Sequence, residues 1–119
     1  MTAELYGCDA GILDDLDGIT SLMLEAASAC GATVVGHRFH RFSPQGVSGV
    51  VIIAESHLAI HTWPEHGYAA LDLFTCGTSV KPRLAVDCLR DGLRAGRVQV
   101  SETPRGLPAR PTARRSAAR

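Results

Sequence analysis

Apolar and polar residues alternate with a helical period in the first part of the chain. Between residues 9 and 30 the apolar positions recur every three or four residues and form one stripe of an amphipathic helix. These positions are Ile12, Leu13, Leu16, Ile19, Leu22, Met23, Ala26, Ala27 and Cys30. Asp9 can cap the start of this helix and Gly31 can end it. The pattern therefore predicts one helix over residues 9–30.

A second helix is predicted over residues 82–94, where Pro82 suits the first turn and Gly96 lies just past the end. Gly92 weakens this helix by about 1 kcal/mol relative to alanine. Much of the remaining chain has the composition and period of strands. The predicted strands cover residues 33–42, 49–53, 57–63, 68–76 and 98–100, and a further one begins at residues 5–6.

Two helices and about five strands, joined mostly by short turns, predict an α+β fold. We expect a two-layer sandwich in which one antiparallel β-sheet carries the two main helices on one face. The run VVII, residues 50–53, is apolar at every position and is expected to be buried on both faces. The sheet face opposite the helices must be solvated or covered by another subunit.

A tight hairpin is predicted where Pro-Glu-His-Gly separates Trp63 from Tyr68. If Trp63 lies opposite Tyr68, antiparallel pairing places Thr75 opposite Ser56 and Cys76 opposite Glu55. The Cys76 thiol then lies next to the Glu55–Ser56 peptide bond.

His61 is harder to place within this hairpin. The five strand steps from Ser56 to His61 span about 16 Å, which is too far for direct contact. We therefore expect a break in the strand near Ser56, which would bring the two side chains closer together.

The net charge is zero, but the charges are unevenly spread. Residues 1–102 hold all 12 acidic residues, whereas residues 103–119 hold five arginines and no acid. We therefore divide the chain into one domain, residues 1–102, and a disordered tail rich in Arg, Pro and Ala, residues 103–119. A basic tail on an acidic domain does not indicate a nucleic-acid partner. We expect removal of residues 103–119 to leave activity nearly unchanged.

The four cysteines, Cys8, Cys30, Cys76 and Cys88, form no CxxC pair. Free thiols are therefore expected rather than a disulfide framework, and no metal site is expected. No apolar run approaches the roughly 20 residues that span a bilayer. The N-terminal residues lack the basic and apolar regions of a secretion signal. We expect a cytoplasmic protein with no membrane partner.

Residues 55–77, ESHLAIHTWPEHGYAALDLFTCG, gather serine, histidine and cysteine on one hairpin. One interpretation is a hydrolase with Ser56 or Cys76 as nucleophile and His61 as base, although no GxSxG elbow surrounds Ser56. A second is a binding module in which these side chains are structural. A third is a self-processing enzyme whose serine becomes the cofactor. The residue types alone leave all three open.

The same segment, with FSPQGVSGVVII at residues 42–53 before it, resembles the prokaryotic S-adenosylmethionine decarboxylase proenzymes. LYGCD at residues 5–9 and GATVVGHRFHRF at residues 31–42 also resemble this family. The resemblance covers about residues 4–101 and excludes the arginine-rich tail. It favours the self-processing interpretation.

The resemblance implies self-cleavage between Glu55 and Ser56, giving a β chain, residues 1–55, and an α chain, residues 56–119. Ser56 becomes a covalent pyruvoyl group, which forms a Schiff base with the substrate and serves as electron sink for loss of CO₂. Ser48 and His61 match processing residues. His61 would remove the Cα proton of the ester intermediate, and Ser48 would help to hold the shifted carbonyl. Cys76 matches the proton donor to the substrate.

The implied substrate is S-adenosylmethionine, and the implied product, S-adenosylmethioninamine, is the aminopropyl donor of spermidine synthesis. Phe42 matches the aromatic residue that stacks on adenine, Glu65 the acid that binds the ribose hydroxyls, and Trp63 is expected to line the same pocket. Family members of this short type are homodimers of cleaved protomers, so the pocket is expected to involve a subunit boundary. The alternatives are the same pyruvoyl mechanism acting on ornithine or arginine, and a non-catalytic binding or partner subunit.

Overall fold

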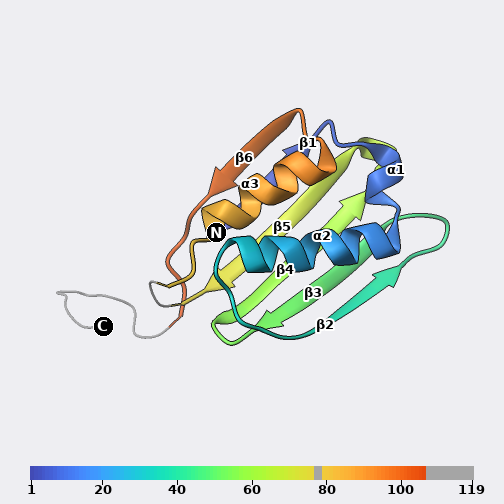
Figure 1. The fold of residues 1–119 in the computed structure, drawn as a ribbon. Coiled ribbons are helices and arrows are strands. Elements are labelled where there is room, and N and C mark those ends of the chain that lie inside the picture. Colours follow the sequence, from blue (N-terminus) through green and yellow to red (C-terminus); the bar gives the residue numbers. More distant parts are fainter. Residues whose placement is uncertain (77–78, 107–119) are drawn as a thin grey trace.

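A single six-stranded antiparallel sheet organises the chain, and two helices cover one of its faces (Figure 1). The structure is a computed structural model that describes residues 1–76 and 79–106. In chain order the elements are β1 (Thr2–Tyr6), α1 (Ala10–Leu13), α2 (Leu16–Ala29), β2 (Val34–Arg41), β3 (Val47–Ile53), β4 (Ser56–Trp63), the 3-10 helix η1 (Pro64–His66), β5 (Tyr68–Thr75), α3 (Pro82–Leu93) and β6 (Arg97–Ser101). The strand order in the sheet is β2-β3-β4-β5-β1-β6. The predicted α+β sandwich is confirmed.

The single helix predicted over residues 9–30 is wrong, because two helices occupy that segment. Asp9 caps α1 as expected, since its Oδ1 accepts a hydrogen bond from the Ile12 amide at 3.0 Å. Asp15 then caps α2, since its Oδ1 accepts from the Gly18 amide at 3.1 Å. A second N-cap aspartate starts a new helix, although the apolar stripe continues through the break. The apolar period alone therefore hid the boundary.

The five strands predicted after residue 30 are confirmed with small shifts at their ends, but the predicted start of the first strand at residues 5–6 is wrong, because β1 begins at Thr2 and ends at Tyr6. β3 begins at Val47, two residues earlier than expected, and β1 lies between β5 and β6. The expectation that residues 50–53 are buried on both faces is wrong. Val51 and Ile53 are buried, but Ile52 is 49% exposed. The helices cover only one face of the sheet, so alternate residues of β3 face outward.

Gly92 has a packing role that its helix propensity does not reveal. The core lies between the sheet and the helices α2 and α3, which pack against each other. A Cβ atom at Gly92 would lie 2.4 Å from Cδ1 of Leu22 on α2. The missing side chain therefore allows α3 to approach α2 closely.

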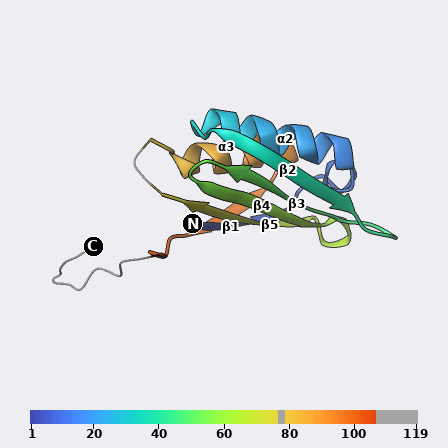
Figure 2. The ribbon, with the colours of Figure 1, turned by 90° about the horizontal axis from the view of Figure 1, so that it is seen from below.

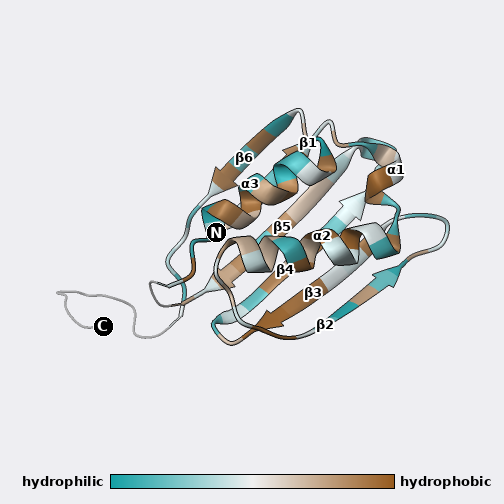
Figure 3. Cartoon of the chain, in the orientation of Figure 1, coloured by the Kyte–Doolittle hydropathy of each residue, from teal (hydrophilic) through white to brown (hydrophobic). Residues whose placement is uncertain are grey.

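The second face of the sheet carries no helix in the described part of the chain (Figure 2). In β4, Leu58, Ile60 and Thr62 are buried beneath the helices. By strand alternation, residues 57, 59, 61 and 63 lie on the other side, which we call the open face. Apolar residues run through β3 as well (Figure 3). The open face thus combines apolar surface with the histidines and tryptophan of β4.

Candidate active site

Ser56 lies at the start of β4, directly after the two-residue turn that joins it to β3. Its φ angle is 149°, in a region that residues with side chains rarely occupy. The turn is tied to the segment before β2, because the Ala54 amide donates to the Thr33 carbonyl at 2.8 Å and the Thr33 amide donates to Glu55 Oε1 at 3.2 Å. Strain of this kind persists only where the surroundings impose it.

Cys76 lies directly beside the Glu55–Ser56 peptide bond. The predicted register is confirmed, since Trp63 pairs with Tyr68 and Ser56 pairs with Thr75. The Cys76 thiol donates a hydrogen bond to the Glu55 carbonyl oxygen at 3.0 Å. This contact polarises the carbonyl that precedes Ser56.

The four thiols differ in exposure. Cys76 is exposed, whereas Cys8 and Cys30 are buried and Cys88 is half-buried. Burial raises the pKa of the Cys8, Cys30 and Cys88 thiols above the ordinary value. These three thiols are therefore held in the protonated, unreactive form, and Cys76 is the one placed for chemistry.

Ser48 and His61 form a pair on the open face, opposite each other on β3 and β4. Ser48 Oγ and His61 Nδ1 lie 2.7 Å apart. The structure does not bring this pair to Ser56, because β4 pairs without interruption from Ser56 to Trp63. The expected break that would bring Ser56 closer to His61 is wrong, because β4 is continuous and the turn at Ala54 and Glu55 precedes Ser56.

The three predicted substrate-binding residues lie at the opposite end of the sheet from Ser56. Phe42 follows β2 and is 46% exposed, with its ring edge-on to His40 at 4.7 Å. Trp63 ends β4 and is 38% exposed, and Glu65 is exposed on η1. Seven strand steps separate Ser56 from Trp63, a distance of about 23 Å.

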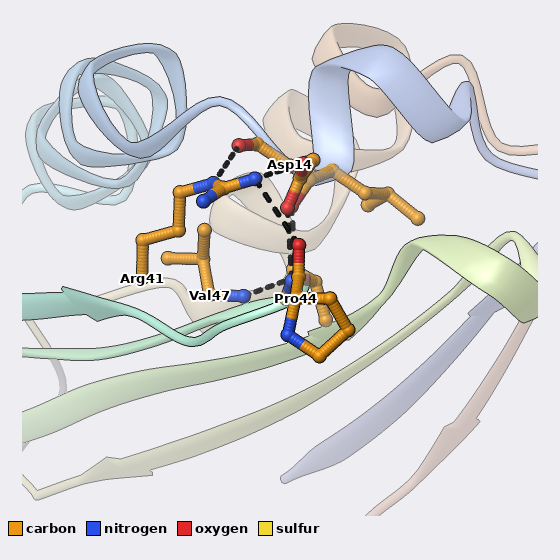
Figure 4. A network of polar contacts seen from close by, with 7 residues as sticks. Asp14, Arg41, Pro44 and Val47 are labelled. Atoms are coloured by element: carbon orange, nitrogen blue, oxygen red, sulfur yellow. Dashed lines mark hydrogen bonds and ion pairs between the residues drawn. The ribbon is translucent and has the colours of Figure 1, made fainter.

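A polar network built on Asp14 fixes the end of the sheet that carries Phe42 (Figure 4). Arg41 Nη2 donates to Asp14 Oδ2 at 2.7 Å, and the Gly46 amide donates to Asp14 Oδ1 at 2.9 Å. Arg41 Nη2 also reaches the Pro44 carbonyl at 3.4 Å. The Arg41 guanidinium and the Gly46 amide lower the pKa of Asp14 below its usual value.

A second group at this end of the sheet centres on Tyr68. Its ring lies between those of Tyr6 and Trp63, with ring centroids 5.4 and 5.3 Å away. The Tyr68 hydroxyl donates to the carboxylate of Glu4, and this bond together with burial raises the pKa of Tyr68 to about 12. Tyr68 therefore stays protonated and holds Trp63 in place.

Sequence reasoning missed three residues that lie near Ser56: His57, Asp72 and Arg105. Ser56 Oγ lies 3.5 Å from His57 Nδ1, and His57 Nε2 lies 3.8 Å from Asp72 Oδ2. Arg105 Nη1 donates to Asp72 Oδ1 at 3.0 Å. The hairpin register is the signal that could have found His57 and Asp72, because it places residues 57 and 72 on one face. No signal in the sequence linked Arg105 to them.

A hollow of about 560 Å³ opens beside this end of β5. Its lining includes Phe74, Thr75, Lys81 and Arg105, but none of the eight predicted site residues within the described part of the chain. Volume alone would place a ligand here, whereas the reactive groups lie on the hairpin. Because catalysis requires contact with the reacting atoms, the candidate site is the hairpin that carries these groups.

The model of the S-adenosylmethionine decarboxylase family matches residues 1–106 of this chain. The chain belongs to the S-adenosylmethionine decarboxylase family. It is 53% identical over 106 residues to an S-adenosylmethionine decarboxylase proenzyme of Acidithiobacillus ferrooxidans, covering 89% of this chain and 80% of the relative. It is 56% identical to a proenzyme of the same name from Thermotoga petrophila, covering 89% of this chain and 82% of the relative.

The fold agrees with a solved structure of the same family. The crystal structure of the adenosylmethionine decarboxylase from Aquifex aeolicus matches with a TM-score of 0.76 and 35% identity, covering 88% of this chain and 93% of that chain. Membership in the S-adenosylmethionine decarboxylase family confirms the resemblance drawn from the motifs and the expectation of a decarboxylase. Family membership does not favour the alternative substrates, ornithine and arginine. It does not favour a non-catalytic role either.

The family match ends at residue 106 and so includes Arg105. The domain boundary after residue 102 remains a prediction, and residues 107–119 of the predicted tail lie outside the described residues. Among the described residues no helix is long and apolar enough to cross a membrane.

Proposed function

We propose that the chain decarboxylates S-adenosylmethionine with a pyruvoyl group made from its own Ser56. The observation that carries this proposal is the junction at Glu55 and Ser56. There the backbone of Ser56 has an unfavourable φ angle of 149°, and the Cys76 thiol donates to the carbonyl in front of it at 3.0 Å. The junction supplies a hydroxyl nucleophile and a polarised carbonyl on neighbouring residues, which suits self-cleavage.

The cleavage uses groups that this chain supplies. Ser56 Oγ loses its proton and attacks the Glu55 carbonyl carbon, the peptide C–N bond breaks, and the nitrogen takes up a proton, which leaves an ester. Removal of the Ser56 Cα proton then expels the Glu55 carboxylate, and hydrolysis of the resulting enamine releases ammonia. The products are residues 1–55 and a second chain that begins with a pyruvoyl group. By the family resemblance, His61 removes the Cα proton and Ser48 holds the shifted carbonyl.

The pyruvoyl group supplies an electron sink for loss of CO₂ from the substrate. Cleavage also changes the surroundings of Cys76, because the Glu55 carbonyl that accepts its hydrogen bond leaves with the β chain terminus. The thiol is then available to return a proton to the substrate. Cys76 thus serves both steps from one position.

A homodimer explains why the predicted site residues lie at two ends of one sheet. Ser56 and Cys76 lie at one end, whereas Phe42, Trp63 and Glu65 lie at the other, about 23 Å away. If two protomers pair through their open faces in antiparallel fashion, each Ser56 end covers the partner's substrate-binding end. A two-fold interface of this kind uses the same patch on both copies. The exposed Ile52 and Trp63 supply apolar surface for it.

The proposed product is S-adenosylmethioninamine, the aminopropyl donor for spermidine synthesis, and the proposed location is the cytoplasm. No nucleic acid or membrane takes part. Phe42, Trp63 and Glu65 are proposed to bind the adenosine portion of the substrate, since an exposed aromatic ring offers a stacking face and a carboxylate accepts ribose hydroxyl protons.

Mass spectrometry of the purified protein tests the proposal directly. We expect two fragments that divide between residues 55 and 56, the larger one without a free α-amine, and release of CO₂ from S-adenosylmethionine. Ser56→Ala should remain one chain without activity. An active, uncleaved wild-type chain would refute the mechanism, and CO₂ release from ornithine or arginine alone would refute the substrate.

A further inference from the structure

We propose that His57, oriented by Asp72 and Arg105, is the base that takes the Ser56 hydroxyl proton in the first step of self-cleavage. The inference rests on the proposed function, because it assigns a residue to a step of that reaction. Ser48 and His61 are about 16 Å along the sheet from Ser56 within one protomer. The family resemblance assigns His61 to a later step, removal of the Cα proton, so it names no base for the first step. His57 is the imidazole next to the Ser56 hydroxyl in the same chain.

The contacts of His57 match those of a serine-activating histidine. Its Nδ1 faces Ser56 Oγ at 3.5 Å and its Nε2 faces Asp72 Oδ2 at 3.8 Å. A carboxylate on the Nε2 side favours the tautomer that carries hydrogen there, which leaves Nδ1 free to accept a proton. Both distances are longer than hydrogen bonds, as is common before a catalytic complex tightens.

Arg105 holds Asp72 in the orientation that serves His57. It donates to Oδ1 at 3.0 Å, which leaves Oδ2 directed to the imidazole. Its guanidinium also lies over the ring of Phe74, 4.1 Å from the centroid, and Phe74 pairs with His57 across β4 and β5. Residues 102–105 thus return to the active-site end of the sheet. This contact revises the expectation that residues 103–119 are dispensable.

His57 accepts and then returns the one proton that moves in this step. Its Nδ1 accepts the Ser56 Oγ proton while Oγ bonds to the Glu55 carbonyl carbon. The same nitrogen then donates that proton to the departing amide nitrogen of Ser56 as the C–N bond breaks. The ester and a free amine result, and His57 returns to its neutral form. His61 acts only afterwards, on the Cα proton of the ester.

The two histidines are distinguishable by the species that accumulates when each is replaced. With His57→Gln we expect intact chain, with cleavage slowed about 100-fold or more, the usual effect of removing a general base. Hydroxylamine, which cleaves esters, should release no extra fragment from it. With His61→Ala the ester should accumulate, and hydroxylamine should split the chain. His37→Gln, on the helix-covered side of β2, is the matched control and should cleave normally.

Asp72 and Arg105 are positioning residues in this proposal. Their variants test whether they orient the His57 imidazole. Asp72→Asn should slow cleavage about tenfold, the effect of losing one charge-assisted interaction, and Asp72→Glu should restore part of the rate. A chain ending at Gly106 should cleave at the wild-type rate, whereas a chain ending at Glu102, which lacks Arg105, should cleave more slowly. Circular dichroism and thermal unfolding of each variant verify folding, and added imidazole should partly rescue folded His57→Gly.

Each outcome separates this inference from the proposed function. Normal cleavage of folded His57→Gln, with wild type cleaved and Ser56→Ala intact, would overturn the role of His57 and leave the proposed function standing. Accumulation of a hydroxylamine-sensitive ester in His57→Gln would also overturn it, since the acyl shift would then proceed without His57. If wild type itself stays uncleaved, the proposed function fails, and this inference fails with it.

Discussion

At the scale of single residues, the proposed chemistry depends on the strained backbone conformation of Ser56, whose φ angle is 149°. A positive φ angle in a residue with a side chain costs of order 1–3 kcal/mol. Contacts between the β3–β4 turn and Thr33 impose that conformation. In one of them the Ala54 amide donates a hydrogen bond to the Thr33 carbonyl at 2.8 Å. Cleavage at this bond would release the strain, so part of the driving force for an uphill acyl shift is already present in the folded chain.

Replacement of Cys76 tests the two roles of its thiol. We expect Cys76→Ala to slow self-cleavage about tenfold, because the Glu55 carbonyl loses its hydrogen-bond donor. Turnover by the cleaved fraction should fall by about 100-fold or more, because the proton donor is missing. Rates of fragment formation and of CO₂ release measure the two effects. Cys88→Ala, in a half-buried thiol on α3, should change neither, and wild-type turnover by cleaved Cys76→Ala would contradict the assignment.

At the scale of elements, the residues proposed for self-cleavage and those proposed for substrate binding lie at opposite ends of the sheet. Ser56 begins β4 and Cys76 directly follows β5 at one end, whereas Phe42 and Glu65 lie in the β2–β3 and β4–β5 connections at the other end. The helices α2 and α3 keep the sheet rigid from one side. The Asp14 network ties the β2–β3 connection to the segment between α1 and α2.

The Asp14 network predicts a pH-dependent contribution to stability. Because the folded pKa of Asp14 is lowered, its contribution is complete above the unfolded carboxyl pKa of about 3.9 and is lost as the pH falls through the folded pKa. We expect Asp14→Asn to lower the urea midpoint at pH 7, with a difference from wild type that shrinks at strongly acidic pH. Glu25→Gln, at an exposed position within α2, serves as control. An equal difference at both pH values would contradict the ion-pair explanation.

For Gly92→Ala, helix propensity and packing predict opposite changes in the free energy of unfolding. Propensity predicts a gain of about 1 kcal/mol, whereas overpacking of α3 against α2 predicts a loss of about 1–3 kcal/mol. We expect the loss, because the new Cβ would lie 2.4 Å from Leu22. Urea unfolding measures the sign. Adding Leu22→Ala should make Gly92→Ala less harmful, and a stabilising Gly92→Ala alone would contradict the packing argument.

At the scale of the whole molecule, one protomer does not bring all of the predicted site residues together. The Ser48–His61 pair and the residues proposed to bind the substrate are remote from Ser56 in the same chain. The proposed two-fold pairing of open faces would bring one copy's Ser56 to the other copy's Ser48–His61 pair. The proposed enzyme is thus a dimer with two composite sites.

Complementation between two inactive variants tests the composite site. Ser56→Ala cannot cleave itself, and His61→Ala alone should stop at the ester. When the two are co-expressed, the mixed dimer joins the intact Ser56 of one chain to the intact His61 of the other. We expect the His61→Ala chain to complete cleavage, with mass spectrometry identifying which chain was cut. Failure in a mixed dimer verified by two different affinity tags would show that each site is built within one chain.

The sequence by itself determined the element types, the sheet and the position of Cys76 beside the Glu55–Ser56 bond. These follow from local rules, because a tight turn in an antiparallel hairpin assigns every cross-strand partner by counting. Only the tertiary structure decided the break at Asp15, the exposure of Ile52, the close approach at Gly92, and the meeting of Asp72 with Arg105. It also showed that β4 is unbroken, so that Ser56 and His61 stay apart. These depend on which surfaces cover one another, and residue order along the chain does not determine that coverage.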